Sequence, residues 1–209
     1  MSRQWFINHL KRNIAIYLFM TTLLITGIVF GAIIVNSMNF VQKQDLFFHV
    51  NQFFVKLTNG EPIVSKDILQ KSFSFHIQYL FLILLLGLTI IGIPLIWLFV
   101  FLKGLVIGFS VGFIVNQLGF KGLVLATVSI APQNMLIIPI YIVAASLANL
   151  FSILLFQRIT SRTITTPIGR PLIQYVTAFS LLFIAAFFGS LIETFISYEA
   201  VKFAIESLS

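Results

Sequence analysis

Long apolar runs without charge alternate with short polar gaps along this chain. The first run, residues 14–35, follows a start that carries Arg3, Lys11 and Arg12. A helix rises about 1.5 Å per residue, so a run of this length crosses a hydrocarbon core of roughly 30 Å. It is also longer than the apolar core of a signal peptide. The pattern therefore predicts a first membrane-spanning helix.

Four later runs predict further spans, at residues 77–98, 104–118, 135–156 and 172–192. Gly92 and Pro94 interrupt the second run, and Pro94 is expected to kink the end of that span. The expected fold class is an all-α integral membrane protein with about five transmembrane helices. Residues 1–209 are expected to form a single polytopic membrane domain.

A break is expected between the third and fourth spans, because the uncharged stretch there is too long for one helix. It is placed at Pro132, Gln133 and Asn134, with Pro139 seven residues after the first proline. Residues 122–131 are then too few to cross the bilayer. They are expected either to re-enter it as part of a re-entrant segment or to lie in the interface.

The basic residues predict the orientation, because lysine and arginine in short loops stay cytoplasmic. With the N-terminus cytoplasmic and the C-terminus extracytoplasmic, the inner segments contain every arginine and none of the six acids. The inner basic residues would be Arg3, Lys11, Arg12, Lys103, Arg158, Arg162 and Arg170.

The largest predicted segment outside the membrane is the outer loop at residues 36–76. Within it, apolar side chains recur at helical spacing among charged and polar ones, which predicts an amphipathic helix on the outer leaflet. This helix is large enough to be a docking surface, and we expect partner proteins to bind there. Its apolar residues are Phe40, Phe47, Val50, Phe54 and Leu57.

Small residues spaced by four occur in three of the predicted spans and are typical of close helix packing in membranes. The first, third and fifth spans, which all run outward, are therefore expected to pack together. The residues are Gly27 and Gly31, then Gly104, Gly108 and Gly112, and finally Ala185 and Gly189.

Composition supports a lipid environment and offers little chemistry. The chain is 59% hydrophobic and 9% charged, its net charge of +7 is scattered rather than gathered on one face, and it has no cysteine. Nucleic acid is therefore not an expected partner. A G-x-S-x-G match around Ser110 lies inside a predicted span, where it favours helix packing over a serine nucleophile. We expect no catalytic, metal or cofactor site.

Transport is the main alternative, because the proline break could line a substrate path. Ion-coupled transporters usually keep ionisable side chains inside the membrane. The predicted spans contain none at depth, since His9, His49, His76 and Lys103 all fall outside them. A scaffold is therefore favoured, and a permease or the membrane subunit of an exporter remains the alternative. A third hypothesis, hydrolysis within the membrane, would require Ser110 as the nucleophile.

The chain resembles the stage II sporulation protein M family along nearly its whole length. The resemblance lies in the basic start, the segment from Ile25 to Ser37, the long outer loop and the pair Pro132 and Pro139. Broader relatives have Pro-His-Gly and then a glutamate, where this chain has Pro132-Gln133-Asn134 and Ile137. No role of that histidine or glutamate can therefore be carried over.

The resemblance implies a multi-pass protein of the mother-cell membrane that acts in septal thinning and engulfment of the forespore. It also implies two partners, the peptidoglycan hydrolases called stage II sporulation proteins D and P, besides the lipid bilayer. The function expected is a non-enzymatic scaffold that recruits and positions these hydrolases. Whether the chain also forms a homo-oligomer is left open by the sequence.

Overall fold

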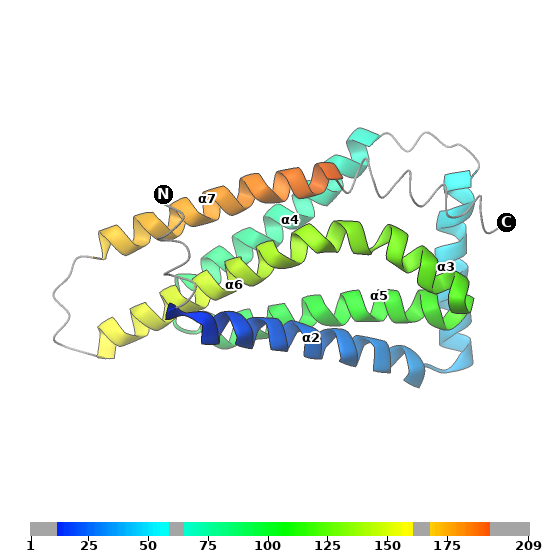
Figure 1. Cartoon of the computed structure of the whole chain (residues 1–209), viewed down its shortest axis with the longest axis horizontal. Helices are drawn as coiled ribbons and strands as arrows, with labels where there is room; N and C mark the ends of the chain where they lie inside the picture. Colours follow the sequence, from blue (N-terminus) through cyan, green and yellow to red (C-terminus); the bar gives the residue numbers. More distant parts are fainter. Residues whose placement is uncertain (1–11, 59–64, 161–167, 193–209) are drawn as a thin grey trace.

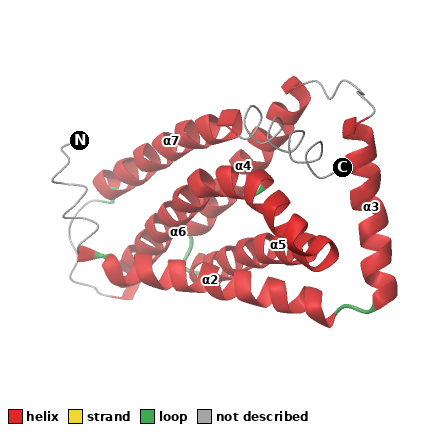
Figure 2. Cartoon of the chain, turned by 45° about the vertical axis from the view of Figure 1, so that its right-hand side comes forward, coloured by secondary structure: helices red, strands yellow, loops and turns green. Residues whose placement is uncertain are grey.

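The computed structural model describes residues 12–58, 65–160 and 168–192, and all regular structure in these ranges is helical (Figures 1 and 2). This confirms the all-α prediction for the described part of the chain. The helices are α2 (Ile14–Ser37), α3 (Phe40–Thr58), α4 (Ser65–Gly87), α5 (Gly92–Ser129), α6 (Ala131–Thr160) and α7 (Gly169–Ile192).

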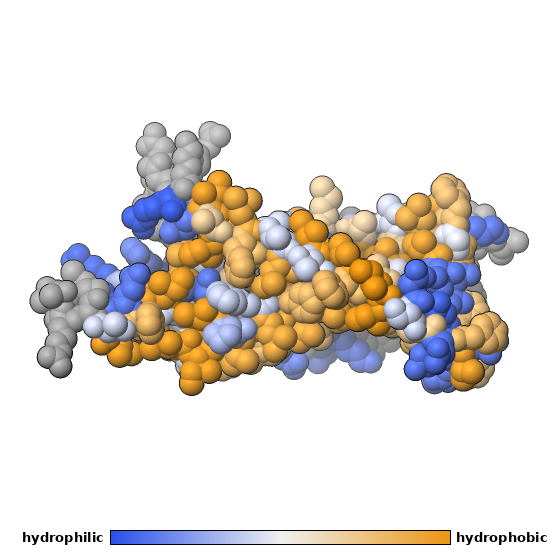
Figure 3. Space-filling view, turned by 90° about the horizontal axis from the view of Figure 1, so that it is seen from below, coloured by the Kyte–Doolittle hydropathy of each residue, from blue (hydrophilic) through white to orange (hydrophobic). Residues whose placement is uncertain are grey.

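Five helices run along the long axis of the molecule in alternating directions, and α3 crosses one end of the bundle (Figure 1). Among the described residues, four stretches are long and apolar enough to cross a membrane: Ile14–Ser37, Gly92–Val128, Asn134–Thr160 and Gly169–Leu191. Large apolar side chains cover much of the outer surface (Figure 3). The chain is therefore a multi-pass membrane protein.

Helix α4 is more polar than the other helices of the bundle. Lys71, His76 and Gln78 lie in it and make it less apolar than α2, α5, α6 and α7. It nevertheless packs alongside α5, α6 and α7. Helix α4 begins at Ser65, so residues 65–76, which were predicted to be the end of the outer loop, belong to this helix of the bundle.

The predicted boundaries of the second and third spans are wrong. A turn at residues 88–91 divides the predicted span 77–98, and α5 begins at Gly92 rather than at Gly104. The Thr89 hydroxyl stabilises this turn, because it donates to the Leu86 carbonyl (2.9 Å) and accepts from the Gly92 N–H (3.0 Å). Pro94 lies in the first turn of α5, where a helix needs no N–H donor from it.

The long apolar stretch turns back at Gly119, a turn that was not predicted, and α5 then ends at Ser129, directly before the break predicted at Pro132, Gln133 and Asn134. Gly119 has φ +58° and ψ −131°, a conformation that glycine adopts readily. The chain turns back there, and a methyl group at Gly122 would collide with the Ile114 carbonyl. Residues 122–129 form the helical end of α5, and a turn at Ile130 joins them to α6 (Figure 2). Their re-entrant or interfacial placement stays a prediction.

The proline segment starts α6 almost without interruption. The Ile130 carbonyl accepts from both the backbone N–H (3.2 Å) and the side-chain Nδ2 (2.9 Å) of Asn134. Pro139 lies inside α6, where it removes one backbone donor from the helix. Helix α6 bends along its course (Figure 1).

Helices α2 and α5 make the closest contact of the bundle, and glycine permits it. A methyl group at Gly27, Gly31, Gly104 or Gly108 would collide with backbone atoms of the facing helix. At Gly112 the nearest atom, the Ala32 Cα, lies 3.1 Å from such a methyl, so the approach is looser there. The two backbones can come this close because glycine has no side chain to separate them.

The prediction that α7 joins α2 and α5 is wrong, because α7 packs against α4 and α6. A methyl group at Gly189 would meet the Ile137 side chain of α6, and Ala185 is half-buried. Helix α6 lies at the centre of the bundle, where Tyr141, Ala144, Ala145 and Ala148 are buried. Every other helix of the bundle contacts it.

Candidate functional site

Ionisable and aromatic side chains meet inside the bundle where α4, α5 and α6 come together. His76 and Tyr79 come from α4, Lys103 from α5 and Tyr141 from α6. His76 lies halfway along α4, and Lys103 lies about 16 Å of helix rise from the start of α5. The cluster is therefore far from both ends of these helices.

Hydrogen bonds and ring contacts connect the three helices at this point. His76 is only 2% exposed, and its Nδ1 shares a hydrogen bond of 2.6 Å with the Tyr141 hydroxyl. Tyr79 donates its hydroxyl to the Phe99 carbonyl of α5 at 2.8 Å. The rings of Tyr79 and Tyr141 have centroids 4.4 Å apart. These contacts hold α4, α5 and α6 in one register.

The Lys103 ammonium group lies over three aromatic rings. Its Nζ is 5.1 Å from the centroid of Tyr141, 5.2 Å from Phe75 and 5.9 Å from Tyr79. Each distance is within the range of a cation–π interaction. A charge inside a membrane helix is costly and such residues are usually functional, so this cluster is the first candidate site.

Sequence reasoning missed this site. His76 and Lys103 were assigned to segments outside the spans, whereas both lie inside helices of the bundle. The transport alternative was disfavoured because no ionisable residue lay at depth, and that premise is wrong. One signal was present: His76 and Tyr79 are three residues apart in α4, which places them on the same helix face.

A second polar region lies along α6 on the C-terminal side of Tyr141. Ser152 donates to the Gly87 carbonyl and Tyr175 of α7 donates to the Leu84 carbonyl, both at 2.9 Å, so they bind the C-terminal end of α4. The Ser146 Oγ and Asn149 Oδ1 atoms are buried and have no hydrogen-bond partner among the described residues.

The second candidate site is helix α3, which is amphipathic as predicted and crosses one end of the bundle (Figures 1 and 2). Phe40 is 72% exposed, and Phe47 is exposed as well. The side chains of Val50, Phe54 and Leu57 lie outside the described ones. Two apolar residues that the sequence reasoning missed, Val41 and Phe48, are also exposed; they are 75% and 58% accessible.

Val41 and Phe48 share one face of α3 with polar neighbours. They line a shallow groove together with Gln44, Asp45 and Phe47. Asp45 lies 3.9 Å from His49 Nε2 one turn later, and both side chains are largely exposed. Exposed apolar side chains beside polar ones mark surfaces that bind proteins or the membrane.

The described residues offer little for metal or nucleophilic chemistry. No group of three or more His, Asp or Glu side chains in the described ranges could hold a metal ion. The Ser110 hydroxyl donates to the Val106 carbonyl of its own helix at 2.9 Å. His9 lies outside the described residues.

Comparison with known proteins gives a single family. The family model described as stage II sporulation protein M matches residues 20–198. No curated protein and no solved structure matches the chain. The match begins within α2 and continues through α7, and so it includes both candidate sites.

Proposed function

The chain belongs to the stage II sporulation protein M family and is a sporulation-related membrane protein; from this premise, we propose that it is a non-enzymatic scaffold. It recruits and positions peptidoglycan hydrolases for septal thinning and engulfment, on the mother-cell side of the sporulation septum. The hydrolases are stage II sporulation proteins D and P. The bond-breaking chemistry then belongs to these partners.

Five membrane crossings are part of the proposal, with α4 as the fifth beside the four apolar stretches. Arg12, Arg158 and Arg170 lie next to the start of α2, the end of α6 and the start of α7, which share one end of the bundle (Figure 1). Because arginine in short loops stays cytoplasmic, this end faces the cytoplasm. Helix α3 at the other end then faces the cell wall.

The scaffold proposal rests mainly on the position of α3 and on its exposed apolar side chains. This helix lies across the end of a tightly packed bundle and presents Val41 and Phe48 outward. Burying an exposed apolar side chain of this size against a partner gives about 1.5–3 kcal/mol. Only Met38 and Asn39 separate α2 from α3, so the membrane-crossing helix keeps α3, and a hydrolase bound to it, close to the membrane.

Helix α3 can be tested by capture of the hydrolases. In V41E/F48E, two charges replace the apolar pair, and we expect recovery of both hydrolases from detergent-solubilised sporulating membranes to fall at least tenfold. The control Gln42→Glu adds a charge to the same helix and keeps the oxygen that accepts from the Asn39 N–H (3.1 Å). It should recover the hydrolases as wild type does. Equal recovery by V41E/F48E would contradict the proposal.

Transport is the second candidate, and the interior of the bundle favours it. Mid-depth ionisable residues are usual in ion and proton pathways. His76 and Lys103 meet this description, and Ser146 and Asn149 add two polar atoms without partners in the described part. The contacts of the cluster, however, join three helices, which favours a structural role.

A further inference from the structure

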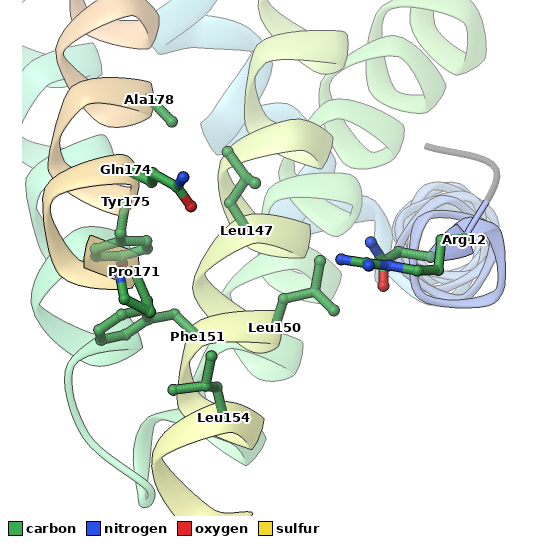
Figure 4. A pocket seen from close by; sticks show the side chains of 10 residues that line it. Arg12, Leu147, Leu150, Phe151, Leu154, Pro171, Gln174, Tyr175 and Ala178 are labelled. Atoms are coloured by element: carbon green, nitrogen blue, oxygen red, sulfur yellow. The ribbon is translucent and has the colours of Figure 1, made fainter. Parts of the chain in front are cut away.

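A cleft of about 510 Å³ opens at the arginine end of the bundle, away from both candidate sites. Its floor is α6, with Leu147, Leu150 and Leu154, and α7 forms one wall (Figure 4). The start of α2 forms the other wall. This volume is within the usual range for a small-molecule site.

The lining of the cleft is apolar with a polar rim. Besides the three leucines it includes Phe151, Pro171, Tyr175 and Ala178. Arg12 and Asn13 lie on the α2 wall, and Gln174 lies on the α7 wall. The guanidinium group of Arg12 points across toward Leu150 (Figure 4). A ligand that fits both parts has a hydrocarbon chain and a negatively charged head.

The position of the cleft identifies the source of such a ligand. Arg12 lies just before the first residue of α2, where the membrane-crossing helix meets the polar end of the bundle. Arg158 and Arg170 also lie at this end of the bundle, but outside the cleft, so Arg12 is the basic residue of its lining. Basic pockets between membrane helices bind the head groups of anionic lipids.

We propose that this cleft binds an anionic phospholipid of the adjoining leaflet. The phosphate contacts Arg12 and Asn13, and one acyl chain lies along Leu147 and Leu150 between α2 and α7. Because α2 and α7 both pack on α6 but do not form a main helix–helix contact with each other in the described part, the lipid bridges these two helices. The site does not depend on the scaffold proposal or on the orientation.

Thermal melting in an uncharged detergent tests the proposal. We expect phosphatidylglycerol to raise the melting temperature of the wild type several degrees more than phosphatidylcholine does. Arg12→Gln should abolish this difference, and Arg12→Lys should retain most of it. Arg170→Gln removes the same charge from an exposed residue outside the cleft and should behave as wild type.

Two further measurements distinguish the alternatives. Leu150→Trp fills the floor of the cleft, and native mass spectrometry should then show fewer bound phosphatidylglycerol molecules although Arg12 is intact. Soluble glycerol phosphate should give no shift. A shift with glycerol phosphate alone would mean a free phosphate site instead of a lipid site. Equal effects of the two lipids, or an equal loss in Arg170→Gln, would overturn the proposal.

Discussion

Gly108→Ala is expected to lower the melting temperature of the solubilised protein by roughly 5–10 °C, which corresponds to about 2–3 kcal/mol. The added methyl would collide with the backbone of Ile28. A flexible side chain could move aside, but here α2 and α5 themselves must separate. The close contact along Gly27, Gly31 and Gly104 would then be lost as well.

The same Gly→Ala substitution at two less crowded positions shows whether the loss of stability comes from the collision or from the exchange of glycine for alanine alone. Gly169→Ala places the same methyl where no atom lies within 4 Å, and it should melt as wild type does. Gly112→Ala should fall between the two, because the Ala32 Cα lies 3.1 Å away and needs to shift only slightly. If Gly108→Ala melts like Gly169→Ala, glycine packing does not hold α2 against α5.

Tyr141→Phe is expected to cost about 1–3 kcal/mol of stability. The substitution removes the hydroxyl that shares the 2.6 Å hydrogen bond with His76 but keeps the ring contacts with Tyr79 and Lys103. Urea or thermal unfolding of the solubilised protein measures this cost. An unchanged stability would mean that the buried hydrogen bond does not fix the register of α4 and α6.

Lys103→Met in the same cluster separates a structural role from transport. The methionine keeps an unbranched chain among the three rings without the charge, so the fold should be at least as stable as wild type. As a scaffold, this variant should capture both hydrolases and support wild-type spore yield. A folded variant that captures the hydrolases but gives no spores would contradict the scaffold account and favour transport.

The sequence predicted a membrane-spanning helix correctly where a long apolar run is bounded by basic residues or by prolines. The first, fourth and fifth predicted spans lie within α2, α6 and α7, because basic residues or a proline segment lie next to each of them. The second and third spans failed because the dividing turn at residues 88–91 is apolar and was not recognised as a turn. Its stability comes from the Thr89 hydroxyl, which carries no hydropathy signal.

The interior cluster shows a second limit of the sequence. A single lysine between two apolar runs is the ordinary sign of a loop, and Lys103 was therefore placed outside the membrane. Its actual environment comes from Phe75, Tyr79 and Tyr141, which lie far from it in sequence. Only the packing of α4 and α6 against α5 brings these rings together. The contact between α2 and α5 was predictable, in contrast, because its signal is the spacing of glycines along each single helix, which can be seen in the sequence.

The scaffold proposal requires α3 and the arginine end to lie on opposite sides of the membrane, with α3 toward the wall. The chain has no cysteine, so single cysteines can report on each side. Q44C places one on exposed α3, and Q157C places one near the exposed end of α6. Both are treated in intact cells with a maleimide that cannot cross the membrane.

We expect Q44C to react in intact cells and Q157C to react only after the membrane is permeabilised. This result would place α3 where wall hydrolases act. If Q157C reacts in intact cells and Q44C does not, α3 faces the cytoplasm. It then cannot dock an enzyme that works on the outer side, and the scaffold account is contradicted.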